Sequence, residues 1–192
     1  MDKENLVIAR IRESINTKEK ILNDQNILLT INKVAEIMIN SIESDGTIYV
    51  CGNGGSASDS LHMAGELVGR FKKERRACAC ISLNADVASM TAIANDYGYD
   101  QIFKRAIEAF ANSKDVVVGI STSGNSKNIF DALKKANDLG ATSIGLLGKD
   151  GGRIKTIAKE SIIVPSEITA HIQEAHITII HILCELIEEV LN

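Results

Sequence analysis

The chain has 192 residues, of which 45% are hydrophobic and 24% are charged, which is the composition of an ordinary globular protein. Its 21 Lys and Arg residues against 25 Asp and Glu residues give a net charge of −4, which argues against a general nucleic-acid binder. Seven aromatic residues (three Tyr, four Phe) and no Trp also make base-stacking surfaces improbable. The four cysteines lack CxxC spacing and stand in apolar segments, which predicts buried thiols in a reducing compartment. They are Cys51, Cys78, Cys80 and Cys184.

The N-terminus shows no export signal, because residues 1–5 are charged and polar and the residues after them are periodic rather than uniformly apolar. No run approaches the roughly 18 apolar residues that cross a membrane. We therefore expect a cytoplasmic protein without a membrane partner.

The N-terminal segment, residues 1–44, is predicted to be helical from residue 5 onward, because its apolar side chains recur at spacings of three and four residues. The polar run 23–26 predicts a break between two helices. These apolar positions are too many to face one small sheet. Their burial, at roughly 25 cal/mol per Å², favours association of subunits through this segment.

Five short apolar runs rich in β-branched residues then predict buried parallel strands, with helical patterns between several of them. They are 48–51, 78–83, 116–120, 143–147 and 161–164. Glycines cluster directly after several of these runs, as expected at strand-to-helix turns, and a last helix is predicted over about 168–191. We predict one doubly wound α/β domain over residues 1–192, with extra helices at both ends. Ligands bind such domains outside the carboxyl ends of the strands.

The loop Gly52–Ser58 follows the first strand, and a helix is predicted to begin near Ser56. Glycines allow close approach of the backbone to a ligand, and a helix N-terminus attracts anions. The loop is neither GxGxxG nor GxxxxGK[ST], which disfavours a dinucleotide or a P-loop nucleotide. The alternative is a tight turn in which Ser56 only caps the helix.

The loop Ser121–Ser126 carries four hydroxyl groups around one glycine, directly after the most apolar strand. Hydroxyl and main-chain N–H groups can surround a phosphate without a fixed charge, so this density favours a phosphate site. The alternative is a Ser/Thr-rich capping turn.

His62 and Glu66 have i, i+4 spacing on the helix after the first loop, so they share a face and could hold a metal or form a surface ion pair. Gln173 and His181 stand about two turns apart on the last helix and can lean toward one site. His176 between them is more typical of a packed core histidine.

Two further segments have both a functional and a plain interpretation. Residues 95–99 (NDYGY) predict a polar turn after a helix, which could bind sugar hydroxyls or be a simple loop. The basic residues at 72, 73, 75 and 76 predict a solvated surface.

Six segments together resemble the sugar isomerase (SIS) phosphosugar-binding family, and within it the phosphoheptose isomerases. They are CGNGGSASDS at 51–60, HMAGELVGRF at 62–71, TAIANDYGY at 91–99, GISTSGNSKNI at 119–129, GKDGG at 148–152 and IQEAHITIIH at 172–181. The resemblance covers essentially the whole chain. It implies an SIS domain with a five-stranded parallel sheet in flavodoxin-like order.

The same resemblance implies an activity and an assembly. Members of this family convert sedoheptulose 7-phosphate to D-glycero-D-manno-heptose 7-phosphate, which opens heptose synthesis for bacterial surface glycans such as lipopolysaccharide core or capsule. We expect a homotetramer with active sites at subunit interfaces and one Zn²⁺ per subunit. The implied zinc ligands are His62, Glu66, Gln173 and His181. The implied substrate contacts are Asn53, Gly54, Gly55, Ser56, Glu66, Asn95, Asp96, Ser121, Thr122, Ser123, Ser126 and Gln173.

The chemistry suits these residue types. Moving a carbonyl from C2 to C1 requires removal of a proton from C1 and delivery of one to C2, which a carboxylate and an imidazole can perform through an enediol. We expect Glu66 to be the base and His181 the partner acid or base. Zinc would polarise the carbonyl.

The chain departs from the family pattern at two places, and one rival function has to be weighed against the isomerase. Relatives usually carry Arg where this chain has His171, and often have Arg-Pro where it reads Arg75-Arg76-Ala77. The rival is a non-catalytic SIS protein that associates with the bacterial replication initiator. Such proteins lack the acid and the histidine equivalent to Glu66 and His181, and both are present here.

Overall fold

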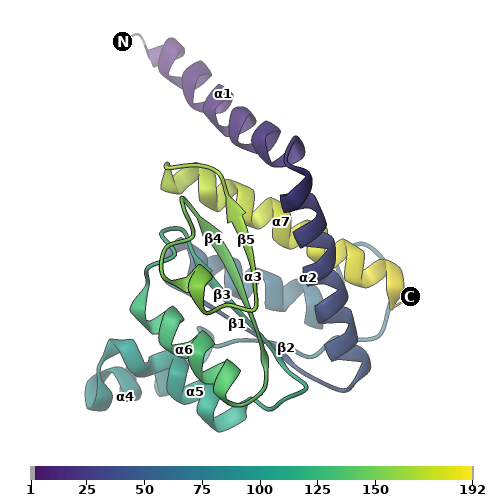
Figure 1. Cartoon of the computed structure of the whole chain (residues 1–192), viewed down its shortest axis with the longest axis vertical. Coiled ribbons are helices and arrows are strands. Elements are labelled where there is room, and N and C mark those ends of the chain that lie inside the picture. The colour runs from purple at the N-terminus through teal and green to yellow at the C-terminus, as the bar shows by residue number, and fades with distance from the viewer. Residues whose placement is uncertain (1–2, 192) are drawn as a thin grey trace.

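The computed structural model describes residues 3–191 and contains a five-stranded parallel sheet in the order β2-β1-β3-β4-β5 (Figure 1). The strands are β1 (Ile48–Gly52), β2 (Cys80–Ser82), β3 (Val116–Ser121), β4 (Thr142–Gly148) and β5 (Glu160–Val164). This order is the flavodoxin-like order, so the predicted fold class is confirmed. The outermost residues of the predicted domain, 1–2 and 192, lie outside the described residues.

The central strands are buried on both faces, which explains their continuous apolar sequences. Ile48 of β1 pairs with Cys80 of β2 on one side and with Val116 of β3 on the other. β2 is shorter than the apolar run that predicted it. As an edge strand it leaves the side chain of Ile81 49% exposed.

The helices cover both faces of the sheet (Figure 1). They are α1 (Lys3–Leu22), α2 (Gln25–Glu43), α3 (Gly55–Val68), α4 (Val87–Tyr97), α5 (Ile102–Phe110), α6 (Lys127–Asp138) and α7 (Thr169–Val190), with short 3-10 helices η1 (Tyr99–Gln101) and η2 (Ile154–Thr156). One hydrophobic cluster joins α2, α3 and α7 to one face, and a second joins α5 and α6 to the other. No helix within residues 3–191 combines the length and apolarity that a bilayer crossing requires.

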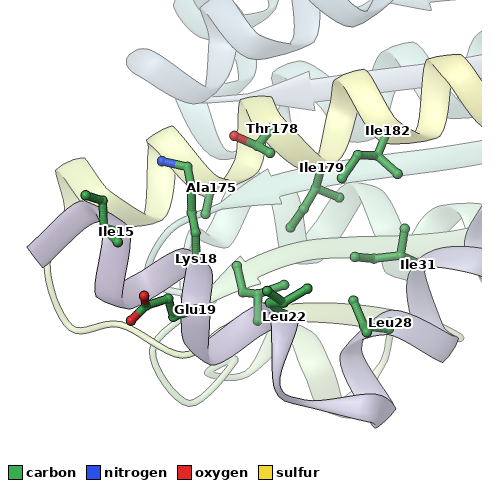
Figure 2. A pocket seen from close by; sticks show the side chains of 11 residues that line it. Ile15, Lys18, Glu19, Leu22, Leu28, Ile31, Ala175, Thr178, Ile179 and Ile182 are labelled. Atoms are coloured by element: carbon green, nitrogen blue, oxygen red, sulfur yellow. The ribbon is translucent and has the colours of Figure 1, made fainter. Parts of the chain in front are cut away.

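The predicted break between the first two helices is confirmed. The side chain of Asp24 caps α2 by accepting hydrogen bonds from the N–H groups of Asn26 and Ile27. α1 extends beyond the sheet (Figure 1), and apolar side chains such as Val7 and Ile11 are 59% and 56% exposed. An apolar groove of about 380 Å³ lies between α1, α2 and α7, lined by side chains such as Ile179 (Figure 2).

All four cysteines are free and buried, as the sequence predicted. Burial raises the pKa of Cys51 and of Cys184 to about 12. These thiols therefore stay protonated and unreactive at neutral pH.

Candidate active site

The carboxyl ends of β1 and β3 lie next to each other, because Gly52 pairs with Ile120 in the parallel register. The chain leaves these strands toward α3 and α6, which cover opposite faces of the sheet. This is the topological switch point of the sheet, where ligands of doubly wound proteins bind. The glycine loop after β1 and the serine loop after β3 therefore border one site.

The glycine loop has little room for side chains. Gly54 has φ +58° and occupies the N-cap position of α3, so the helix begins at Gly55 and the capping role considered for Ser56 is wrong. Ser56 is instead buried inside the first turn. A Cβ on Gly52 would lie 2.3 Å from the Ser56 carbonyl oxygen, so this close approach requires glycine.

Asn53 connects the glycine loop to the start of α6. Its Nδ2 donates a hydrogen bond to Oδ1 of Asn128, and Nδ2 of Asn128 donates one back to Oδ1 of Asn53, each at 2.9 Å. The Tyr99 hydroxyl also donates to Oδ1 of Asn53, at 3.0 Å. These contacts hold the Asn53 side chain between two loops.

Hydroxyl groups of the serine loop bond within the loop and do not cap α6. Ser126 stands at the N-cap position of α6, yet its side chain makes no capping hydrogen bond. Its Oγ lies 3.0 Å from Oγ of Ser121 instead, so the capping-turn alternative is wrong for Ser126. The Ser123 hydroxyl accepts a hydrogen bond from the N–H of Asn125 at 3.2 Å. A Cβ on Gly148 would lie 2.7 Å from the Thr122 carbonyl oxygen, so Thr122 passes close to the end of β4.

Backbone packing fixes the shape of the serine loop. Gly124 has φ +64°, and a Cβ there would lie 2.1 Å from the Gly151 carbonyl oxygen. The N–H of Ile154 donates to the Gly124 carbonyl at 2.9 Å. The segment after β4 therefore packs against the serine loop at Gly124 and restricts its conformation.

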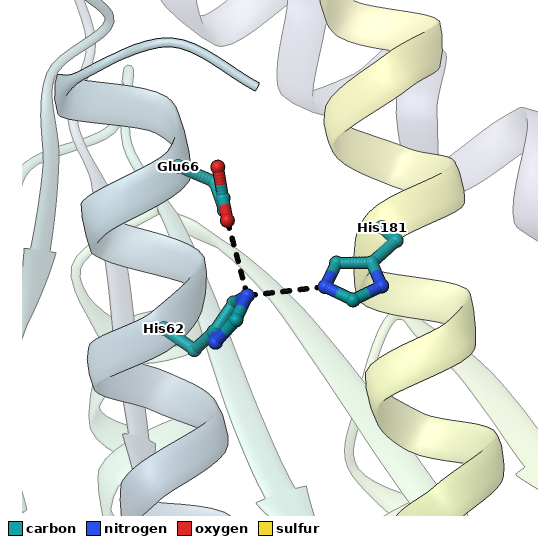
Figure 3. A group of neighbouring side chains, drawn as sticks. All are labelled: His62, Glu66 and His181. Carbon is teal, nitrogen blue, oxygen red and sulfur yellow. Dashed lines mark hydrogen bonds and ion pairs between the residues drawn. The ribbon is translucent and has the colours of Figure 1, made fainter. Parts of the chain in front are cut away.

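Three titratable side chains meet between α3 and α7 (Figure 3). Nε2 of His62 lies 3.1 Å from Oε1 of Glu66 and 3.0 Å from Nε2 of His181. The i, i+4 spacing brings the first two together, and the packing of α3 against α7 adds the third. The side chains of His62 and Glu66 are 43% and 25% exposed, so a ligand can reach them.

This donor set fits a zinc ion. Zinc prefers imidazole nitrogen and carboxylate oxygen, and bonds of about 2.0–2.2 Å in a tetrahedron place ligand atoms roughly 3.3 Å apart. One ligand atom from each of the three residues lies within 4.8 Å of the other two. Small side-chain shifts are enough to reach that arrangement.

Gln173 lies on α7 beside the glycine loop. A Cβ on Gly55 would lie 2.3 Å from its Nε2, so glycine at this position leaves the space that the amide occupies. Gln173 thus borders the glycine loop, about two turns of α7 before His181.

Comparisons with known proteins show the family to which the chain belongs. Residues 11–148 match the SIS domain family. The chain is 48% identical over 185 residues to the phosphoheptose isomerase of Clostridium acetobutylicum, covering 96% of this chain and 94% of that protein. It is 49% identical over 184 residues to phosphoheptose isomerase 1 of Campylobacter jejuni, covering 95% and 99%.

The chain belongs to the phosphoheptose isomerase family. Solved structures of other phosphoheptose isomerases share its fold. The one from Neisseria gonorrhoeae has a TM-score of 0.91 at 39% identity, covering 97% of this chain and 98% of that one. The one from Francisella tularensis has a TM-score of 0.94 at 34% identity, covering 98% and 100%.

In this member of the phosphoheptose isomerase family, Asn95 and Asp96 do not lie in a polar turn as predicted. α4 continues through Tyr97, so both residues belong to its last turn, and Gly98 with φ +89° ends the helix. Both side chains are exposed, and Nδ2 of Asn95 donates to Oδ1 of Asp96 at 2.8 Å. Within residues 3–191, the Tyr99 hydrogen bond to Asn53 is what joins this segment to the site.

The prediction of a solvated basic surface at 72–76 is wrong for Arg75. Its guanidinium donates to the carbonyl oxygens of Glu66 and Leu67 at 2.8 and 2.9 Å. His171, which was singled out from the sequence, is buried. Its Nε2 lies 3.2 Å from a Glu13 oxygen of α1, and its Nδ1 lies 3.4 Å from a Glu174 oxygen.

Sequence reasoning missed three polar residues around the site. Asn128 stands in the first turn of α6, directly after the serine loop, and this position could have indicated a role in the site. Asp59 lies one turn before His62, its Oδ2 is buried without a partner among the described residues, and burial raises its pKa to about 6. Glu188, 1% exposed near the end of α7, is the third.

His176 is the core residue that the sequence favoured. It is fully buried, and its Nε2 donates to the Leu147 carbonyl at 2.9 Å. Burial lowers its pKa to about 4, so it stays neutral at physiological pH.

Proposed function

We infer that this chain is a phosphoheptose isomerase, an aldose–ketose isomerase that converts sedoheptulose 7-phosphate to D-glycero-D-manno-heptose 7-phosphate. The observation that carries this inference is the meeting of Glu66 with the two imidazoles of His62 and His181. This cluster lies between α3 and α7, and α3 begins at the glycine loop beside the serine loop. The product would supply heptose for a bacterial surface glycan.

The serine loop is proposed to bind the phosphate. The hydroxyls of Ser121, Ser123 and Ser126, helped by Thr122, supply neutral donors. The free N–H groups at the start of α6 favour a dianion at the same place. A phosphate held in this way keeps the sugar chain in a fixed direction.

The glycine loop is proposed to bind the sugar hydroxyls, with the Asn53 amide, the backbone of Gly54 and Gly55, Ser56 and the Gln173 amide as contacts. Asn53 is held in place by Asn128 and Tyr99, so its orientation is set before substrate arrives. Asn95 and Asp96 remain proposed sugar contacts through the segment that Tyr99 joins to Asn53.

Glu66 and His181 are proposed to move the protons. The Glu66 carboxylate takes the C1 proton, the electrons of that C–H bond form the C1=C2 double bond, and the C2 carbonyl oxygen takes a proton from solvent water to become a hydroxyl. The C1 hydroxyl then returns a proton to water as the C1 carbonyl forms, while C2 takes a proton from protonated His181. Each transfer contributes on the order of 10²–10⁴-fold to the rate.

We propose one zinc ion per subunit at His62, Glu66, Gln173 and His181. When bound there, zinc supplies a Lewis acid that stabilises negative charge on the substrate oxygens. The chemistry of the donor set supports this proposal.

A homotetramer with active sites at subunit interfaces is the proposed assembly. Support comes from α1, whose apolar side chains are exposed along its length, and from the apolar groove beside it (Figure 2). Contiguous apolar surfaces of this kind are uncommon on monomeric proteins. Four buried free cysteines support the cytoplasm as the compartment.

The rival function, association with the replication initiator without catalysis, is not supported. It applies to relatives without the acid and the histidine, whereas this chain has both and its matched relatives are phosphoheptose isomerases.

The direct test is to incubate the purified protein with sedoheptulose 7-phosphate and to follow the aldose by NMR. We expect conversion to the heptose 7-phosphate. If the purified protein binds metal but converts no heptulose phosphate and no hexulose phosphate, the inference is overturned.

A further inference from the structure

The segment Phe71–Arg75 begins three residues after Val68, the last residue of α3, and contacts both α3 and α7. We call this segment the α3–α7 strap. It links the helix that carries His62 and Glu66 to the helix that carries His181.

The start of the strap contacts the catalytic face of α7. The ring of Phe71 stacks on the ring of His181, with centroids 5.4 Å apart and an interplanar angle of 22°. Lys72 places its Nζ 5.3 Å from the centre of the Phe71 ring and pairs with Glu185 at 2.7 Å. The Phe71 ring thus contacts both a cation and the histidine.

A buried acid fixes the backbone of the strap. The Glu188 carboxylate is 1% exposed and accepts hydrogen bonds from the N–H groups of Lys72, at 2.9 Å, and of Lys73. A carboxylate near a helix C-terminus is disfavoured by the helix dipole. Its hydrogen bonds to the strap offset this cost, and they anchor the residue that follows Phe71.

The other end of the strap holds α3. Arg75 donates to the carbonyl oxygens of Glu66 and Leu67 in the last turn of α3, where a cation is favourable. The strap therefore limits how far the Glu66 turn can move from α7.

His181 needs such support because its ring is not fixed by a second protein hydrogen bond. Histidines that bind metals usually donate their other ring N–H to a carboxylate or carbonyl, which sets the ring plane. Within residues 3–191, Nδ1 of His181 has no hydrogen-bond partner. The contact that restricts the plane of the His181 ring is instead the stacked ring of Phe71.

We propose that Phe71 is a positioning residue, anchored through Glu188, that fixes the ring plane of His181 for proton transfer and metal binding. Phe71 belongs neither to the proposed metal ligands nor to the proposed substrate contacts. Its effect passes entirely through His181. The zinc part of this inference rests on the proposed metal site, whereas the turnover part rests only on the isomerase activity.

The test replaces Phe71 by Leu, which keeps apolar volume but removes the flat ring, and by Tyr, which keeps the ring. For Phe71→Leu we expect a loss of about tenfold in both zinc affinity and kcat, with KM changed less than twofold. Phe71→Tyr should restore both to within twofold of the wild type.

A second readout needs neither substrate nor metal. The chain has four histidines, so their ring signals can be assigned in the metal-free protein by NMR. Ring current from Phe71 should shift the His181 ring protons upfield in the wild type and in Phe71→Tyr, and the shift should vanish in Phe71→Leu.

Glu188→Gln and Glu189→Gln form a matched pair on the same turn. Glu188 binds the strap backbone, whereas the pairing of Glu189 among the described residues is an exposed ion pair with the Lys73 side chain at 2.6 Å. We expect Glu188→Gln to lower kcat several-fold with an unchanged KM, and Glu189→Gln to behave as the wild type.

Phe71→Leu with kcat within twofold of the wild type, or with a rise in KM equal to its loss in kcat/KM, would overturn the proposal. A wild-type protein that binds no zinc would refute the proposed metal site, and the kcat and NMR readouts would still decide the role of Phe71.

Discussion

The two ends of the site are built in different ways. The proposed reaction end consists of charged or titratable side chains from two helices, where His62 and His181 meet although 119 residues separate them in the sequence. The phosphate end is one continuous loop of neutral hydroxyls, shaped by glycine and braced by backbone contacts. The first arrangement suits proton transfer, and the second suits binding without chemistry. Substitutions at the two ends should therefore separate kcat from KM.

The largest effect should come from Glu66→Gln at the reaction end. The amide keeps the size of the side chain but cannot accept a proton, so kcat should fall on the order of 10²–10⁴-fold with little change in KM. Glu43→Gln is the control, because Glu43 is exposed at the end of α2 and does not belong to the His62–Glu66–His181 cluster. Near-normal turnover of Glu66→Gln would refute the base assignment.

Gly124→Ala should give the largest effect at the phosphate end. The methyl group would clash with the Gly151 carbonyl at a φ of +64°, so the loop must shift. We expect KM to rise at least about tenfold, since several phosphate contacts shift together. Gly140→Ala is the control for strain alone, because Gly140 has φ +84° at the amino edge of β4. It should cost stability and leave KM unchanged.

Ser123→Ala should have a smaller effect of the same kind. Loss of one hydroxyl donor removes about 1 kcal/mol of binding, so steady-state kinetics should show KM raised about fivefold with kcat nearly constant. A fall in kcat as large as the fall in kcat/KM would show that this loop acts in the transition state, and the contrast between the two ends would fail.

Outside both ends, His176→Gln should alter the pH dependence of folding stability. The pKa of His176 is lowered to about 4 in the folded state, so the unfolded chain binds more protons as pH falls below about 6.5. The wild type should lose about 2 kcal/mol of folding stability from this group between pH 7 and pH 5. Denaturation of His176→Gln at both pH values should show that loss removed. An equal loss in the variant would contradict the assigned pKa.

Much of the fold could be predicted from the sequence because it depends on local periodicity. Buried parallel strands read as apolar runs, and the break that Asp24 caps reads as a polar gap. α4 was predicted to end too early, because the polar side chains of Asn95 and Asp96 look like a turn although the helix only ends at Gly98.

The site was less accessible to sequence reasoning. Spacing could pair His62 with Glu66, but only the resemblance to a family joined them to His181, because helix packing brings these residues together. Asn128 and Glu188 escaped notice for the same reason: each acts through a partner far away in the chain. The sequence places Arg75 in a basic run that was predicted to be solvated, whereas its guanidinium donates to carbonyl oxygens of α3.

The central claim is proton transfer by Glu66 and His181, and the most direct measurement is the hydrogen content of the product formed in D₂O. Aldose made by the wild type should carry solvent deuterium at C2, because the acid that delivers this proton exchanges with water. Glu66→Gln should form almost no labelled product. Wild-type aldose with C2 free of deuterium, its hydrogen carried over from C1, would show transfer of the same hydrogen from C1 to C2 and contradict delivery of the C2 proton by His181.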